Sequence, residues 1–211
     1  MKYKALFVLS FLVGCLPTSF LRVFFYKFFF KYNLDNVKFG FGCQIYCRSF
    51  TATNCNFGSF NSFIGPFTII FRDGCTIGRK NHFFCDGFVL TSKKFDYRRE
   101  AIFGENCNIS HNHYFDISGR LTVGDNCWFG GAGTQIWTHG PGLKERMVSI
   151  GNNCYVGSSS LIGPGAKINN YTLVAMGTCL TEAFDDCYQL IGGVPAKLIY
   201  SDFNWITWRH L

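Results

Sequence analysis

The stretch VSIGNNCYVGSSSLIGPGAKINNYTLVAMGTCLTEAFDDCYQLIGGVPAKL, residues 148–198, repeats a simple pattern every six residues. Aliphatic residues recur at that spacing: Ile150, Val156, Ile162, Ile168, Val174 and Leu180. A small residue precedes each of the last five by two positions: Cys154, Ser160, Ala166, Thr172 and Thr178. Six is the period of neither a helix nor a strand. A strict longer period indicates stacked units, and six-residue units indicate a parallel β-helix.

Each unit supplies one short strand and one corner, so three units make one coil of a triangular prism, roughly 18 residues long. The aliphatic and the small side chain point inward and stack on their equivalents in the next coil. Glycine follows several of the aliphatic positions, as in Gly151, Gly157 and Gly163. Glycine permits the left-handed backbone that such corners use.

The same period continues, with breaks, through the rest of residues 37–200, which we expect to form one all-β domain. Its earlier core positions are often phenylalanine: Phe57, Phe63, Ile69, Phe71, Ile77, Phe83, Val89, Phe103, Ile109, Phe115, Ile117, Val123 and Phe129. Two charged or glycine-rich segments, 91–101 (TSKKFDYRREA) and 140–147 (GPGLKERM), interrupt it and are predicted to be exposed loops. The charged first loop either is merely solvated or borders an acceptor site and receives a phosphate. Residues 201–211 form a C-terminal tail.

Residues 1–36 form a separate segment that is apolar, aromatic and basic. Its apolar run, 5–17, is shorter than the about 20 residues that span a bilayer. Five basic side chains precede the first acidic one, Asp35: Lys2, Lys4, Arg22, Lys27 and Lys31. We expect residues 1–32 to lie at a membrane interface, with these charges toward the anionic cytoplasmic leaflet. A cap on the open end of the β-helix and a signal peptide are the other interpretations.

Composition restricts the classes of partner. The net charge of +7 suits a phosphate-bearing ligand or an anionic membrane, and no nucleic-acid-binding motif accompanies it. Three of the eleven cysteines, Cys107, Cys127 and Cys154, share a G-x-N-C context and fall in the small inward position of the repeat. No CxxC pair is present. We therefore expect reduced core thiols in a cytoplasmic protein, neither a disulfide framework nor a zinc cluster.

Two further motifs carry a family resemblance: THG at 138–140 and GGVPAK at 192–197. With the repeat, they make the chain similar to the hexapeptide-repeat acyltransferases, and most similar to O-acetyltransferases of bacterial surface-polysaccharide synthesis. The resemblance implies a left-handed β-helix, a homotrimer with sites between subunits, acetyl-CoA as donor, a carbohydrate acceptor and no metal. It also implies a cytoplasmic enzyme, which the basic N-terminal segment would hold at the inner face of the membrane.

His139 is the predicted catalytic base. A sugar hydroxyl must lose its proton as it attacks a thioester, and a neutral histidine suits that task. His139 ends the IWTH segment where the repeat breaks, and the matching histidine is the general base in the family. Asp116 is predicted to orient it by accepting a bond from its other nitrogen. His113 and Trp137 are predicted to contact substrate. A strict count of three repeats back from His139 reaches Leu121, not His113.

The donor is predicted to lie in a groove lined by small residues, namely Gly157, Ser158, Ala175 and Gly177, with Lys197 on a CoA phosphate. Corner geometry explains each glycine equally well. A backbone N–H would stabilise the oxyanion, and the sequence does not identify which.

Two alternative functions remain. One is a metal enzyme resembling γ-class carbonic anhydrases, with His82, His113 and His139 as ligands. The other is a catalytically silent membrane scaffold.

Overall fold

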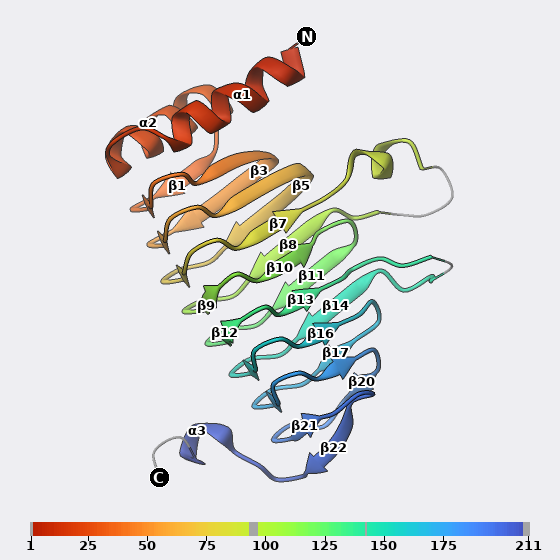
Figure 1. The fold of residues 1–211 in the computed structure, drawn as a ribbon. Coiled ribbons are helices and arrows are strands. Elements are labelled where there is room, and N and C mark those ends of the chain that lie inside the picture. The colour runs from red at the N-terminus through yellow and green to blue at the C-terminus, as the bar shows by residue number, and fades with distance from the viewer. Residues whose placement is uncertain (1, 93–96, 142, 209–211) are drawn as a thin grey trace.

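The computed structural model describes residues 2–92, 97–141 and 143–208, so parts of both expected loops lie outside the described residues. The chain is a left-handed parallel β-helix with two helices at its N-terminal end (Figure 1). Each strand pairs with the strand in the equivalent position of the next coil, as the six-residue period predicts. Each regular coil contributes one strand to each of three walls.

The first wall is a nine-stranded sheet whose neighbouring strands are parallel up to its last pair. Its strands are β2 (Lys38–Phe39), β4 (Asn56–Phe57), β6 (Thr76–Ile77), β9 (Asn108–His111), β12 (Trp128–Ala132), β15 (Tyr155–Val156), β18 (Leu173–Val174), β21 (Leu190–Gly192) and β22 (Lys197–Tyr200). Only β22 runs antiparallel, against β21.

The other two walls belong to one 13-stranded sheet because two long strands, β3 (Gln44–Thr53) and β5 (Ser62–Phe71), run through both. The second wall continues with β7 (His82–Phe84), β10 (Tyr114–Asp116), β13 (Gln135–Ile136), β16 (Leu161–Ile162) and β19 (Cys179–Leu180). The third contains β1 (Asn33–Asp35), β8 (Glu100–Phe103), β11 (Arg120–Val123), β14 (Met147–Ile150), β17 (Lys167–Ile168) and β20 (Ala183–Phe184).

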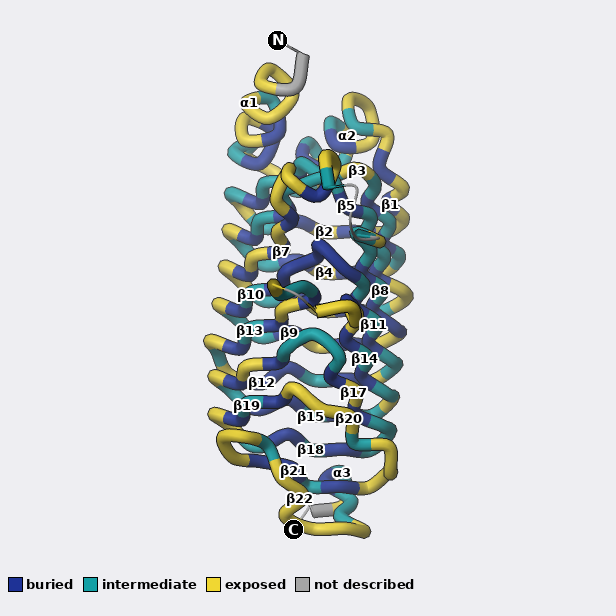
Figure 2. The backbone as a smooth tube through the Cα atoms, turned by 90° about the vertical axis from the view of Figure 1, so that its right-hand side faces the viewer, coloured by how far each residue is buried: buried dark blue, intermediate teal, exposed yellow. Residues whose placement is uncertain are grey.

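The interior of the prism contains the residues that the period places there. Every repeat position named above, from Phe57 to Leu180, is buried, and so are the five small residues from Cys154 to Thr178. Figure 2 shows buried and exposed residues alternating along the walls. Phenylalanines stack through the middle coils, with the rings of Phe83 and Phe115 4.5 Å apart. The phenylalanine-rich repeats therefore build core, as predicted.

One corner, which leads into the first wall, takes nearly the same turn in every coil. A residue with positive φ is followed by a buried side chain, as in Asn106–Cys107, Asn126–Cys127 and Asn153–Cys154. The thiol of each of these cysteines lies within hydrogen-bonding distance of a carbonyl in the next coil; for Cys127 Sγ and Gly151 O the distance is 2.9 Å. We call this edge the thiol corner. Its five stacked cysteines are Cys55, Cys75, Cys107, Cys127 and Cys154.

Helices α1 (Lys2–Gly14) and α2 (Ser19–Phe30) cover the first coil. The Tyr26 hydroxyl is buried between them and donates to Cys43 O at 2.7 Å, while it accepts from Ile45 N at 3.1 Å. Arg22 is also buried and donates to Phe39 O. The expectation that Arg22 faces a membrane leaflet is therefore wrong, because its guanidinium satisfies carbonyls at the end of the prism. No helix in the described part of the chain is long and apolar enough to cross a membrane.

The corner between the second and third walls is the irregular one, and we call it the site corner. Among the described residues, it comprises 48, 66–67, 85–92 with 97–99, 117–119, and 137–141 with 143–146 in successive coils. Both inserted loops leave the prism here, on the same side of the molecule (Figure 1). The first loop contains a short helix, η1 (Gly87–Leu90). At the far end of the chain, α3 (Trp205–Trp208) returns to the prism, where Trp205 Nε1 donates to Asn153 O at 2.7 Å.

Candidate active site

Asp116 and His139 meet on the site corner because the chain inserts three extra residues between Phe115 and Ile136, beyond the 18 of three strict repeats. Phe115 pairs with Ile136, whereas a strict repeat would pair it with Gly133. Two of the three extra residues lie between Phe115 and Val123, at the corner turn 117–119, because Val123 already pairs with Phe103 at a separation of 20 residues. The third forms a bulge at the end of β12, where Gly131 and Gly133 have φ of +60° and +80°. The strict count that placed Leu121 beneath His139 is therefore wrong, and Leu121 pairs with Val148.

The carboxylate of Asp116 is almost fully buried, and both of its oxygens accept hydrogen bonds. Oδ1 accepts from the Ser118 hydroxyl at 2.7 Å. Oδ2 accepts from the backbone N–H of Thr138 at 3.0 Å and lies 2.7 Å from Nδ1 of His139. A buried charge needs such partners, since an unpaired one would cost several kcal/mol in desolvation. The network fixes the carboxylate in one orientation.

That orientation determines which nitrogen of His139 can act as a base. An ionised carboxylate only accepts hydrogen bonds, so the neutral imidazole carries its proton on Nδ1, facing Asp116. The lone pair is then on Nε2, which has no hydrogen-bond partner among the described residues. The His139 side chain is 26% exposed, against 2% for Asp116. A substrate proton can therefore reach the basic nitrogen from solvent.

Gly119 allows the second loop to close over this pair. A Cβ at Gly119 would lie 2.0 Å from Arg146 O and 2.5 Å from Thr138 O, so only glycine fits beneath the loop. Its N–H donates to the Thr138 hydroxyl at 2.8 Å. Sequence reasoning missed Ser118, Gly119 and Thr138, although Thr138 directly precedes His139 in the THG motif.

The first loop encloses His139 with aromatic rings. The ring centroids of Phe88 and Tyr97 lie 5.7 Å and 6.3 Å from that of His139. The guanidinium of Arg146, from the second loop, lies 4.6 Å from the Tyr97 ring centroid, within cation–π range. The two loops thus contact each other beside the Asp116–His139 pair. Nothing in the sequence indicated these contacts, because they depend on which coils carry the insertions.

A basic pocket adjoins the pair on the third-wall side. Its volume is about 260 Å³, and four of its six lining side chains are cationic: Arg98, Arg120, Lys144 and Arg146. One charge is balanced, since Arg120 lies 3.1 Å from Glu100. Positive charges gathered in one hollow attract anionic ligands.

Trp137 lies two residues before His139 and is 38% exposed. It packs against Tyr114 of the neighbouring coil, with ring centroids 5.0 Å apart. Its indole N–H donates to Gln135 Oε1 at 3.2 Å. The two rings form an aromatic platform on the outer face of the second wall, beside the site corner. The predicted contact of Trp137 with substrate stays a prediction.

His113 lies elsewhere, inside the prism. Its side chain is fully buried in a column of polar residues that includes Asn61 and Asn81. Nδ1 of His113 accepts from Thr134 N at 3.2 Å. Burial, with a smaller contribution from the nearby His111, lowers the pKa of His113 to about 4. The structure does not bring His113 to the surface of this subunit, so its predicted substrate contact gains no support from its position.

The residues predicted to bind the donor occupy a different corner from His139. Gly157 and Ser158 follow β15, and Ala175 and Gly177 follow β18, where the first wall turns into the second. Each glycine has a structural reason: a Cβ at Gly157 would lie 2.6 Å from Met176 N, and Gly177 has φ of +70°. Lys197 begins β22 in the first wall. Within one subunit, these residues and His139 are separated by the width of the second wall.

The three histidines considered as metal ligands do not converge. His113 is in the core, His139 pairs with Asp116, and Nδ1 of the exposed His82 lies 2.8 Å from the Ser62 hydroxyl. Across the residues that the structure describes, no group of three or more His, Cys, Asp or Glu side chains is arranged to hold a metal ion.

Part of the chain is similar in sequence to a curated protein. Over 120 residues, the chain is 35% identical to the bifunctional protein GlmU of Clostridium botulinum. The matched region covers 56% of this chain and 23% of GlmU. The chain thus spans about a quarter of the length of this curated relative. The chain is a hexapeptide-repeat β-helix and resembles the acyltransferases built on that repeat. No family model matches it.

Two solved structures of the same class are similar over much of the chain. One is the polySia specific acetyltransferase NeuO, with 16% identity, a TM-score of 0.46, and coverage of 82% of this chain and 88% of NeuO. The other is a maltose O-acetyltransferase from Clostridium difficile 630, with 22% identity, a TM-score of 0.43, and coverage of 61% and 70%.

Proposed function

We propose that this hexapeptide-repeat protein is an acyltransferase, and specifically an acetyl-CoA-dependent O-acetyltransferase that acts on a sugar hydroxyl in surface-polysaccharide synthesis. The observation that carries the proposal is the Asp116–His139 pair. A buried, fully bonded carboxylate orients a part-exposed imidazole at the one corner where two loops leave the prism.

The arrangement suits direct transfer. Nε2 of His139 accepts the proton of the acceptor hydroxyl as its oxygen bonds to the thioester carbon. The carbon–sulfur bond then breaks, and His139 returns the proton to the departing sulfur. Asp116 holds the tautomer and stabilises the imidazolium that forms between the two steps. No covalent acyl-enzyme is required, and backbone N–H groups of the corner stabilise the oxyanion.

The donor site requires a second subunit in this proposal. The outer face of the second wall bears the exposed apolar side chains of Trp137 and Leu161 between His139 and the corner of Gly157 and Gly177, and Met176 is exposed on that corner. A threefold assembly would bury such a face and bring one subunit's small-residue corner to the His139 of the next. Acetyl-CoA would lie in the groove between them, with Lys197 on one of its phosphates.

We also propose that the enzyme works in the cytoplasm at the inner face of the membrane. Helices α1 and α2 turn large apolar side chains to the outside, among them Phe11, Phe20 and Phe28, which are 56%, 76% and 56% exposed. Lys27 and Lys31 lie near the end of α2. An apolar face bordered by lysines suits the interface of an anionic leaflet. The basic pocket suits phosphates of the donor or of an anionic acceptor.

The test compares His139→Ala with His82→Ala, an exposed histidine on the same wall. Thiol release from acetyl-CoA would be followed with a panel of free, nucleotide-linked and lipid-linked sugars. For His139→Ala we expect kcat to fall by roughly 10² to 10⁴, with the donor Kd changed by less than about tenfold. His82→Ala should resemble the wild type. Loss of donor binding with turnover intact would contradict a base at His139, and equal loss in both variants would favour a metal site.

A further inference from the structure

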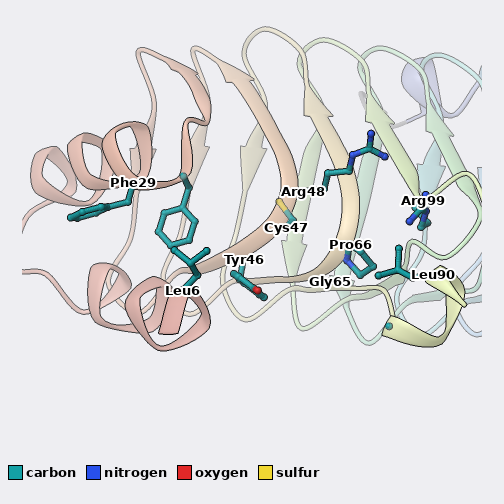
Figure 3. A pocket seen from close by; sticks show the side chains of 11 residues that line it. Leu6, Phe29, Tyr46, Cys47, Arg48, Gly65, Pro66, Leu90 and Arg99 are labelled. Atoms are coloured by element: carbon teal, nitrogen blue, oxygen red, sulfur yellow. The ribbon is translucent and has the colours of Figure 1, made fainter. Parts of the chain in front are cut away.

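A second cavity opens on the site corner, closer to the N-terminal helices. Its volume is about 660 Å³, within the range of small-molecule sites. It is bounded by α1 and α2 at one end and by the first loop at the other, over the corner turns of β3 and β5 (Figure 3). None of the residue roles assigned above uses it.

Most of the lining is apolar. The helices contribute Leu6, Phe29 and Phe30, and the strands contribute Tyr46 and Pro66. Leu90 approaches from the first loop (Figure 3). Leu90 is 61% exposed, so the cavity is open to the surface where the first loop borders it. A lining of this kind suits a hydrocarbon chain that enters from a membrane interface.

Two arginines give the cavity a positive end. Arg48 and Arg99 both line it, and no acidic side chain does so among the described residues. Within the described part of the chain, the Arg48 guanidinium has neither an ion-pair nor a hydrogen-bond partner. Arg99 donates from Nε to Tyr97 O at 3.1 Å. Its terminal amino groups form no ion pair within the part of the chain that the structure describes. A guanidinium binds phosphate through two parallel N–H donors.

The cavity and the Asp116–His139 pair lie along the same corner of the prism, the site corner. Pro66 belongs to a coil two steps above that of Asp116, a separation of about 10 Å at the usual spacing of strands. Gly87 and Leu90 of the cavity and Phe88 beside His139 belong to the same η1 turn. A molecule that binds in the cavity with its anionic group at the arginines therefore has the part beyond that group directed toward His139.

We propose that this cavity binds the lipid part of a lipid-linked sugar acceptor, with Arg48 and Arg99 on the phosphate that joins lipid and sugar. The proposal names the acceptor class of the acyl transfer proposed above, and rests on that function. It accounts for three features together: the apolar lining, the arginine pair and the position on the corner of the catalytic histidine. A phosphate without a chain would use only the arginines, and an uncharged chain would use only the apolar lining.

Binding of decyl phosphate to the full-length protein, measured by calorimetry below the micelle concentration, tests the proposal without requiring turnover. Decanol and inorganic phosphate are the matched half-ligands. Arg48→Gln removes the cation, and Leu90→Glu places a carboxylate at the cavity. Arg79→Gln is the control, since Arg79 is exposed outside the cavity. Circular dichroism verifies that each variant is folded.

We expect Arg48→Gln and Leu90→Glu each to weaken decyl phosphate binding by roughly tenfold or more, the usual effect of losing a charged hydrogen bond. Arg79→Gln should bind as the wild type does, and both half-ligands should bind more weakly than decyl phosphate. Unchanged affinity in both cavity variants, or equal weakening in Arg79→Gln, would overturn the proposal. Inorganic phosphate that displaces decyl phosphate at similar concentration would show a simple anion site and also overturn it. If the protein binds decyl phosphate specifically but catalyses no acetyl transfer, the cavity proposal would stand and the proposed enzymatic function would be rejected.

Discussion

Two corners of the same prism have opposite characters. At the thiol corner, successive coils repeat the same turn: Asn106, Asn126 and Asn153 share a left-handed backbone, and the following cysteines stack in the core. At the site corner, one coil turns tightly through residues 117–119, while its neighbours on either side carry long excursions. The strands between the corners are alike, so the difference lies only in what the turns contain.

This contrast separates the origins of fold and chemistry. The uniform corner adds one identical interface per coil, which is how a solenoid gains stability. The irregular corner places Asp116 in a tight turn between two loops, where His139 begins one and Phe88 and Tyr97 belong to the other. The proposed chemistry lies where neighbouring coils differ, because there side chains from several coils converge outside the core.

Replacing Asp116 with asparagine tests the irregular corner most severely. The amide would offer a donor or a weaker acceptor to Nδ1, so the proton of His139 would no longer be fixed on that nitrogen. We expect kcat to fall by between about tenfold and 10⁴-fold, the upper figure being that for the corresponding change in a serine protease triad. Asp73→Asn, an exposed carboxylate near the thiol corner, is the control and should leave kcat unchanged. An equal loss in both variants would remove the distinction between the corners.

The interior histidine provides a second, smaller test. His113 has a pKa of about 4 because its burial disfavours the charged form, against about 6.5 in an unfolded chain. The unfolded state therefore binds more protons between these values, and the contribution of His113 to stability, complete above about pH 6.5, is lost as the pH falls toward 4. The full effect is about 3 kcal/mol. Its size follows from the fully buried position of the ring.

His113→Asn should remove that part of the acid sensitivity, since Asn61 and Asn81 already occupy the same column. The measurement is the free energy of unfolding by denaturant at pH 7 and pH 4.5 for both proteins. His82→Asn, on an exposed histidine, serves as the control. A wild-type pH dependence that persists in His113→Asn would show that this histidine does not titrate on unfolding in this range.

Cys127→Ala at the thiol corner should have the smallest effect. Removing a buried thiol leaves a small cavity and forfeits its contact with Gly151 O, which we expect to cost about 1 kcal/mol of unfolding free energy. Turnover should stay at the wild-type value, because no residue of the pair contacts Cys127. A kcat lowered by tenfold or more, with stability intact, would mean that the thiol corner also serves the reaction.

The six-residue period was sufficient to predict the core and the class of fold, because each inward position depends only on its place in the repeat. The partnership of His139 with the corner of Ser118 depended instead on register, which two extra residues at the turn 117–119 and one at the bulge near Gly131 had moved. A count along the sequence finds the bulge only if the later strand pairings are known. The packing of Tyr97 against Arg146 is a property of two loops and has no period at all. The burial of Arg22 was missed for another reason, since a cation in an aromatic helix is usually assigned to a surface.

A stack of identical coils has no length of its own, and in principle another copy could continue it at either end. Here the first end is closed by α2, whose Arg22 and Tyr26 bond to carbonyls of the first coils. At the last end, β22 reverses direction against β21, so the edge it presents does not continue the parallel ladder. Within the described residues, the parallel ladder is therefore interrupted at both ends, which disfavours its continuation into a second copy.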